Sequence, residues 1–134
     1  MEVRFAFLCD FANESGGKLN ALGLGWNSIF TAEVPVVHPQ MSIVAGFEFH
    51  VSELGQKAVQ VRMIDADGAD VSPPLNATFE VKQPESGTVS RQNIILNMQG
   101  LRFDKYGDYS VHVTVDGEER ARLVFAIERP PTTG

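Results

Sequence analysis

The sequence has one cysteine, few basic residues and no long hydrophobic run, and each scarcity excludes a class of protein. Cys9 has no second cysteine for an internal disulfide, and its apolar surroundings favour a buried thiol. The 11 Lys and Arg residues are outnumbered by 17 Asp and Glu residues, which gives a net charge of -6. A nucleic-acid surface needs clustered Lys and Arg, so we expect no nucleic-acid partner.

The apolar stretches are also too short for a membrane span, which needs roughly 20 residues, so we expect no membrane association. The amino terminus reads Met-Glu-Val-Arg-Phe and lacks the features of a signal peptide. We therefore expect a cytoplasmic protein. The length of 134 residues is typical of one domain and no linker divides it. This predicts a single β-sandwich domain over residues 1–128 and a frayed tail over 129–134.

Apolar and polar residues alternate with a period of two through much of the chain, which predicts β-strands. The clearest case is residues 108–115 and 119–127, separated by Asp116-Gly117, a sequence typical of a tight hairpin turn. Similar rows upstream are separated by turn signals roughly every 10 to 15 residues. We therefore predict an all-β fold: an immunoglobulin-like antiparallel β-sandwich of about seven to nine strands, without a disulfide.

A tyrosine before the last hairpin supports this fold class. Tyr109 stands two residues before Val111, and immunoglobulin-type sandwiches place a tyrosine at that distance from an inward position that holds a cysteine there. We expect the Tyr109 hydroxyl to bond back to the chain upstream, as in the tyrosine corner.

The first thirty residues are expected to form a hairpin of about residues 3–12 and 18–27, for which two registers are open. In the first, phenylalanines of the first strand cover Gly23 and Gly25 in the core. In the second, the large residues face the core and leave a flat apolar outer patch. That patch would serve self-association, such as a homodimer, or a protein partner, and it consists of Ala6, Leu8, Ala21, Gly23 and Gly25.

The acidic segment from Asp65 to Asp70 suggests calcium only by its composition. A calcium loop of the EF-hand type needs glycine at position 6 and glutamate at position 12, whereas counting from Asp65 puts Gly68 at position 4 and Asn76 at position 12. We expect a solvated turn between two strands, and weak calcium binding is left open.

Catalytic patterns are absent from the sequence, which has neither a Gly-x-Ser-x-Gly elbow nor a phosphate-binding glycine loop. The three histidines are far apart, and no ligand cluster accompanies them, so we expect no metal or other cofactor. By alternation His50 and His112 point outward, while His38 precedes Pro39 in a segment that we interpret as a strand-to-strand crossover. Glu118 and Glu119, at the last turn, are expected to serve solubility. We therefore expect no enzymatic activity.

Five segments read together carry a resemblance: residues 7–12 (FLCDFA), 17–23 (GKLNALG), 37–40 (VHPQ), 97–101 (NMQGL) and 107–109 (GDY). They resemble a family of small bacterial cytoplasmic proteins classed as a domain of unknown function. The resemblance implies a bacterial, cytoplasmic, stand-alone β-domain and supplies no catalytic or binding residue.

Within those segments, some polar residues are not explained by turns or apolar packing. They predict a candidate functional surface made of Asp10, Asn13, Lys18, Asn20 and His38. The sequence favours a non-catalytic protein-interaction or assembly module. The alternative is a small-ligand or weak metal-binding domain that uses the loop ends of the sandwich.

Overall fold

A computed structural model describes residues 1–131, which form ten β-strands and one short 3-10 helix. The all-β class is confirmed, and the ten strands exceed the expected seven to nine. The elements are β1 (Glu2–Cys9), β2 (Phe11–Ser15), β3 (Lys18–Leu22), β4 (Ser28–Phe30), β5 (Val36–His50), η1 (Val51–Glu53), β6 (Gly55–Asp65), β7 (Leu75–Val81), β8 (Val89–Phe103), β9 (Gly107–Val115) and β10 (Glu118–Glu128).

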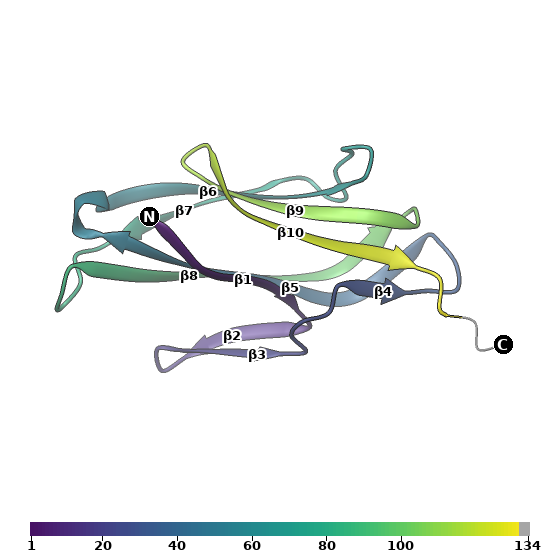
Figure 1. Cartoon of the computed structure of the whole chain (residues 1–134), viewed down its shortest axis with the longest axis horizontal. Coiled ribbons are helices and arrows are strands. Elements are labelled where there is room, and N and C mark those ends of the chain that lie inside the picture. Colours follow the sequence, from purple (N-terminus) through teal and green to yellow (C-terminus); the bar gives the residue numbers. More distant parts are fainter. Residues whose placement is uncertain (132–134) are drawn as a thin grey trace.

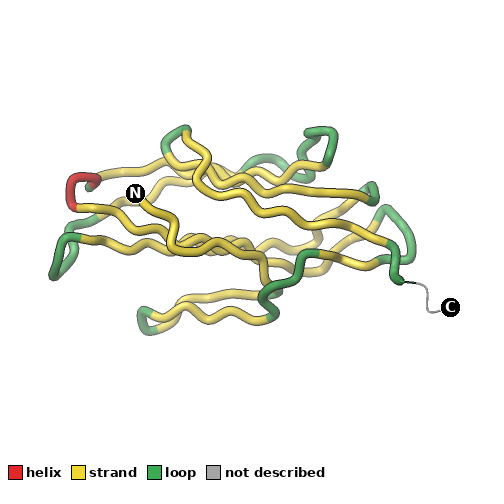
Figure 2. The backbone as a smooth tube through the Cα atoms, viewed as in Figure 1, coloured by secondary structure: helices red, strands yellow, loops and turns green. Residues whose placement is uncertain are grey.

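The strands form three sheets, with the orders β1-β5-β8, β4-β10-β9-β6-β7 and β2-β3. The two larger sheets lie in two layers, and the β2–β3 hairpin lies outside the three-stranded sheet (Figures 1 and 2). The expectation of purely antiparallel pairing is wrong at one edge, where β4 runs parallel to the end of β10. No helix within residues 1–131 has the length and hydropathy of a membrane span.

The main core lies between the two larger sheets. Its largest fully buried side chains include Phe47 and Phe49 of β5, Phe103 of β8 and Phe125 of β10. The only cysteine of the chain, Cys9, is buried and free. The core therefore forms from apolar packing without a disulfide.

The C-terminal hairpin is confirmed as β9 and β10. Asp116 and Gly117 both take positive φ angles, 49° and 83°, which a tight hairpin turn of this kind requires. Val111, Val113 and Val115 form the expected inward row. The ladder is irregular between Glu119 and Ala121, and this shifts the residues that follow.

The hydrogen bond expected of Tyr109 is also confirmed. Its hydroxyl donates to the carbonyl oxygen of Lys105 at 2.7 Å, and its ring stacks on Phe125. Burial raises the pKa of this hydroxyl, so it remains a hydrogen-bond donor.

The predicted first hairpin is wrong. β1 pairs antiparallel with β5 instead, from Glu2 opposite Glu48 to Cys9 opposite Ser42. The chain then breaks at Asp10, and a separate hairpin forms from β2 and β3. Neither proposed register exists, because Gly23 and Gly25 follow β3 in a loop with φ angles of 69° and 87° rather than lying in a strand.

The crossover predicted at His38 and Pro39 is wrong as well, because both residues lie inside β5. Pro39 falls between the paired residues His38 and Gln40, and Gly100 occupies the corresponding place in β8. A long paired strand, rather than a connection, therefore carries this proline. Of the tail predicted to be frayed, Arg129 to Pro131 are exposed, and residues 132–134 lie outside the described residues.

Candidate functional site

The β2–β3 hairpin forms a third layer beside the three-stranded sheet (Figure 1). Five residue pairs hold its strands together, from Phe11 opposite Leu22 to Ser15 opposite Lys18. Gly16 and Gly17 form its turn, with φ angles of 58° and 75° that suit glycine at both positions. Local turn chemistry thus closes the hairpin, and its attachment to the sheet depends on other contacts.

The inner row of the hairpin packs on the sheet through a second apolar cluster. Its buried members are Cys9, Ala12 and Val44, each with no measurable exposure. Partly buried side chains surround them, namely Phe5, Phe7, Leu19, Ala21 and Ile95. Since the main core packs against the other face of β5, this strand is covered on both faces, and residues 41–47 are all buried.

An asparagine of β8 fixes the hairpin to the sheet. Asn97 donates from Nδ2 to the carbonyl oxygen of Ala12 at 3.1 Å, and its Oδ1 accepts from the Ala12 amide at 3.5 Å. The buried Ser42 hydroxyl of β5 also bonds to Oδ1. Closer to the hairpin tip, Asn93 Nδ2 donates to Glu14 Oε1 at 3.1 Å. These bonds tie β2 to the edge strand β8, and Ser42 in turn ties Asn97 to the central strand β5.

Cys9 lies beneath this attachment and is buried. Burial is the largest influence on its pKa and raises it, so the reactive thiolate is disfavoured. The expectation of a buried thiol is therefore confirmed.

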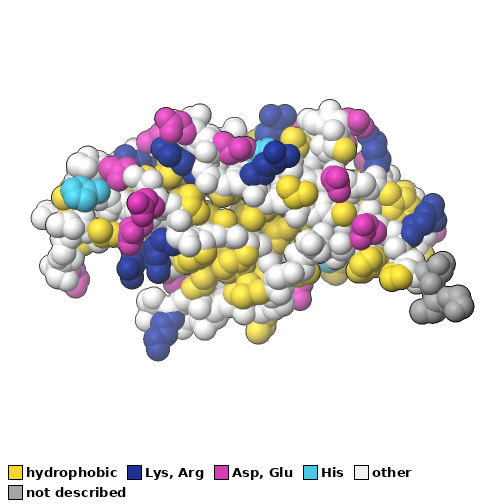
Figure 3. Space-filling view, in the orientation of Figure 1, with side chains coloured by type: hydrophobic (Ala, Val, Ile, Leu, Met, Phe, Trp, Pro, Cys, Tyr) yellow, Lys and Arg dark blue, Asp and Glu magenta, His cyan; other side chains and the backbone are white. Residues whose placement is uncertain are grey.

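The outer row of the hairpin leaves apolar side chains in water. Phe11 and Leu22, which are cross-strand partners, are 38% and 68% exposed, and Leu24 just beyond is 56% exposed. Ten large hydrophobic residues are exposed within residues 1–131, and half of them lie between positions 11 and 37: Phe11, Leu22, Leu24, Phe30 and Val37. Apolar surface reaches from the body of the molecule down to the hairpin (Figure 3). This segment thus holds half of the large hydrophobic residues that are exposed within residues 1–131.

Three of the predicted surface residues meet on this outer row. Asn20 donates to Asn13 across the hairpin at 3.1 Å, and Lys18 lies exposed beside the turn. Asp10 lies at the junction of β1 and β2, where its amide donates to the Leu22 carbonyl at 2.9 Å. We call Phe11, Leu22 and Leu24, together with Asn13, Lys18 and Asn20, the docking surface.

His38, the fifth predicted residue, lies elsewhere. Its ring is 6.2 Å from that of Trp26, and burial lowers its pKa, so the neutral imidazole is favoured. His38 therefore lies beside Trp26 and near Asp10, whose charge opposes the effect of burial on the His38 pKa, and not on the outer row of the hairpin.

The predicted apolar patch is not formed. Leu8 is buried in the main core and Ala6 packs against that core, on the inner face of β1. Ala21 faces the second cluster under the hairpin, whereas Gly23 and Gly25 are exposed in the following loop. The five residues are therefore divided among three environments because β1 pairs with β5.

The acidic turn is held by its own hydrogen bonds. Asp65 Oδ1 accepts from the amides of Asp67 and Ala69, at 2.9 Å each, and the bond from Ala69 is the largest influence lowering the Asp65 pKa. Lys105 Nζ lies 2.8 Å from Asp67 and 3.6 Å from Asp65, so a cation of the chain already neutralises these carboxylates. Within residues 1–131, no three His, Cys, Asp or Glu side chains are grouped as a metal site would require.

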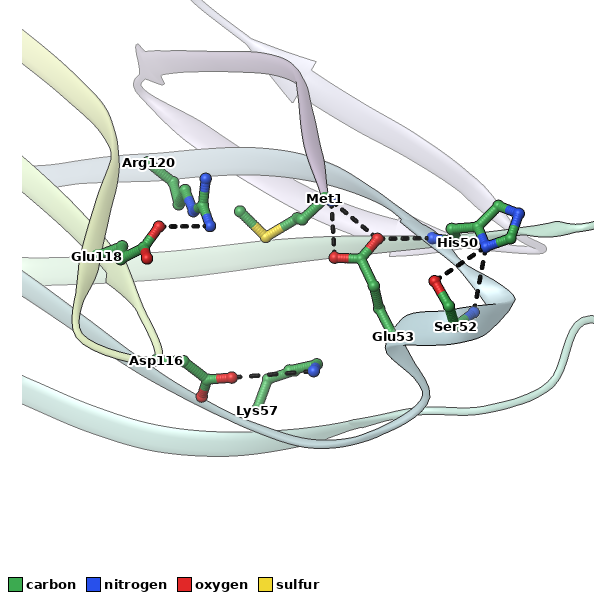
Figure 4. Close-up of polar contacts among 8 residues, drawn as sticks. All are labelled: Met1, His50, Ser52, Glu53, Lys57, Asp116, Glu118 and Arg120. Carbon is green, nitrogen blue, oxygen red and sulfur yellow. Dashed lines mark hydrogen bonds and ion pairs between the residues drawn. The ribbon is translucent and has the colours of Figure 1, made fainter.

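A polar cluster closes the opposite end of the molecule (Figure 4). The Met1 amino group lies 2.7 and 2.8 Å from the carboxylate oxygens of Glu53, and Glu53 also accepts from the His50 amide at 3.0 Å. His50 Nδ1 accepts in turn from the Ser52 amide at 3.2 Å. These contacts anchor the start of β1 to η1.

A second arrangement that sequence reasoning missed lies on the outer face of the five-stranded sheet. Ser110 Oγ is 2.8 Å from His112 Nε2, and His112 Nδ1 is bonded to Glu119. Glu119 therefore contacts a histidine instead of serving solubility alone. The spacing of Ser110 and His112 places them on one strand face and was visible in the sequence, but the contact with Glu119 depends on the irregular ladder of β10.

The fold and the attached hairpin define a class of protein: an all-β chain of two larger sheets with an added two-stranded layer. The chain belongs to a family of unknown function (DUF6941), whose model matches residues 4–128. A search of curated proteins finds no match.

Two solved structures are similar in part. One is the Pseudomonas fluorescens alkylpurine DNA glycosylase AlkC bound to DNA containing an abasic site analog, with 18% identity and a TM-score of 0.49 over 76% of this chain and 28% of that one. The other is a beta-glucosidase from Listeria innocua in complex with isofagomine, with 9% identity and a TM-score of 0.52 over 76% of this chain and 15% of that one. The chain thus spans less than a third of either protein, and the second likeness concerns the fold alone.

Proposed function

We propose that this protein is a protein-interaction or assembly module and that the docking surface on the β2–β3 hairpin binds its partner. The observation that supports this is the exposure of Phe11 and Leu22, cross-strand partners on one face of the hairpin, with Leu24 exposed just beyond them. Exposed apolar side chains that lie together on one face are typical of an interaction site.

The composition of the docking surface also suits an interface. Phe11, Leu22 and Leu24 supply apolar contact area, and the bonded Asn13–Asn20 pair with Lys18 supplies polar groups beside it. Protein interfaces commonly combine an apolar centre with a polar rim. The bonds from Asn97 hold the hairpin in place, which reduces the entropy that a partner would otherwise have to overcome on binding.

A matched pair of substitutions tests the proposal. Leu22→Lys puts a charge in the docking surface, and Val124→Lys puts one on β10, where Val124 is 52% exposed. We expect Leu22→Lys to abolish co-purification of a partner, or to reduce the assembly mass in light scattering, while Val124→Lys leaves both unchanged. Retention of partner and mass by a folded Leu22→Lys protein would contradict the proposal.

The small-ligand or metal-binding alternative has less support, because the carboxylates at the Asp65 loop end are already bonded to backbone amides and to Lys105. We also propose that the two larger sheets form an immunoglobulin-like sandwich. The Tyr109–Lys105 hydrogen bond supports this, since such a corner recurs in that class.

A further inference from the structure

The hydrogen-bonded chain Ser110–His112–Glu119 joins three groups in a specific order of atoms. The serine oxygen faces Nε2 of the histidine, and the carboxylate bonds to Nδ1 of the same ring. Nucleophilic catalysis by serine requires this order: a base within hydrogen-bond reach of the hydroxyl, and a third group that orients the base.

The neighbourhood of this chain is open to a small molecule. Ser110 and His112 line a cavity of about 330 Å³ on the outer face of the sheet, together with Arg122, Val124, Asp65 and Asp108. Arg122 is the ladder partner of His112 on β10, and no ion pair engages it within residues 1–131. The cavity thus brings together a hydroxyl, a base and a cation.

We propose that Ser110 is a nucleophile that cleaves small carboxylic esters, with His112 as its general base and Glu119 as the residue that positions His112. The cavity volume limits the ester to a small one. This proposal goes beyond the docking role and does not depend on it. The Ser110 site lies on the five-stranded sheet, whereas the docking surface lies on the β2–β3 hairpin.

The reaction balances within these groups and water. Ser110 Oγ bonds to the ester carbonyl carbon while its proton passes to His112 Nε2. The bond from that carbon to the alkoxy oxygen then breaks, and the departing alcohol takes the proton from Nε2. Water next attacks the acyl carbon and gives a proton to Nε2, which returns it to Ser110 as the carboxylic acid leaves. Glu119 accepts from Nδ1–H and so keeps Nε2 free as the base.

Labelling with a fluorophosphonate tests the nucleophile on the unaltered protein. Attack by an activated serine forms an Oγ–P bond and releases fluoride. We expect one adduct per chain, found on Ser110 by peptide mapping, and a p-nitrophenyl acetate hydrolysis that the adduct abolishes. The absence of an adduct after long incubation, or an adduct on another residue, would overturn the proposal without relying on any variant to fold.

Variants then separate the roles. Ser110→Ala should abolish labelling, whereas Ser90→Ala on β8 should leave it unchanged. His112→Asn should slow labelling by about 100-fold or more, as loss of a general base does. Glu119→Gln should slow it and alter its pH profile, whereas Glu118→Gln, which removes the carboxylate paired with Arg120, should change neither. A Glu119→Gln protein with the wild-type rate and pH profile would rule out positioning by Glu119.

Discussion

The ring of Phe5 lies directly over Gly46, its cross-strand partner on β5. A Cβ atom added to Gly46 would lie 2.6 Å from Cε2 of this ring, closer than real side-chain contacts allow. The missing side chain of Gly46 is therefore the space that Phe5 occupies, and this contact sets how closely Phe5 approaches the sheet beneath the hairpin.

The first prediction follows from this contact. Gly46→Ala should destabilise the protein by about 1–3 kcal/mol, the usual cost of overpacking. The denaturant midpoint at unchanged slope measures the effect. The same change made in a Phe5→Ala background should cost clearly less, because the ring that clashes is gone. Equal costs in both backgrounds would contradict the contact.

One of the two registers considered from the sequence has phenylalanines covering glycines. The structure has such a contact, but the glycine is Gly46 and not Gly23 or Gly25. Gly23 and Gly25 resemble strand positions only when the segment after Leu22 is assumed to continue β3. Nothing in the apolar pattern of residues 3–12 says that β1 pairs with β5, more than thirty positions along the chain. The C-terminal hairpin was predictable because its pairing is local and Asp116-Gly117 specifies the turn.

The second prediction concerns Asn97. Asn97→Ala removes the bonds to both backbone groups of Ala12 and should loosen the hairpin from the sheet. Cys9, buried beneath it, then serves as a reporter: its alkylation by iodoacetamide should become markedly faster. Asn76→Ala, on the distant strand β7, is the control and should leave Cys9 as protected as in the wild type. Unchanged protection in Asn97→Ala would mean that apolar packing alone holds the hairpin.

The third prediction concerns Tyr109. Tyr109→Phe removes the hydroxyl that donates to the Lys105 carbonyl and should lower the free energy of unfolding by about 1 kcal/mol, more if that carbonyl finds no other donor. Chemical denaturation at constant slope would measure this. An unchanged midpoint would show that the corner bond adds nothing to stability.

The fourth prediction is a pH dependence. The hydrogen bond with the Met1 amino group, and secondly that with the His50 amide, lower the pKa of Glu53. A carboxyl whose folded pKa lies below its unfolded pKa stabilises the fold above the unfolded pKa, and this contribution is lost as the pH falls through the folded pKa. Glu53→Gln should therefore be less stable than the wild type near neutral pH, and the two unfolding curves should converge in acid. A difference that persists unchanged in acid would refute the linkage.

The candidate sites were predictable to different degrees. Asn13, Lys18 and Asn20 were identified from residues that turns and packing did not explain, and one hairpin face carries all three. The hydrogen-bonded group of Ser110, His112 and Glu119 was not predicted. Glu119 comes from a different strand than the other two, and alternation alone does not give the register between strands. His38 lies beside Trp26 and near Asp10 rather than on the outer row of the hairpin.

The double covering of β5 has a consequence for any shortened form of this protein. A deletion of residues 11–22 would look harmless on a topology diagram, because the hairpin pairs with no other strand. It would nevertheless expose Val44 and Cys9 to water, and leave Phe7 and Ile95 without their cover on the same side. The trimmed body would expose a second apolar face and should aggregate more readily than the intact chain.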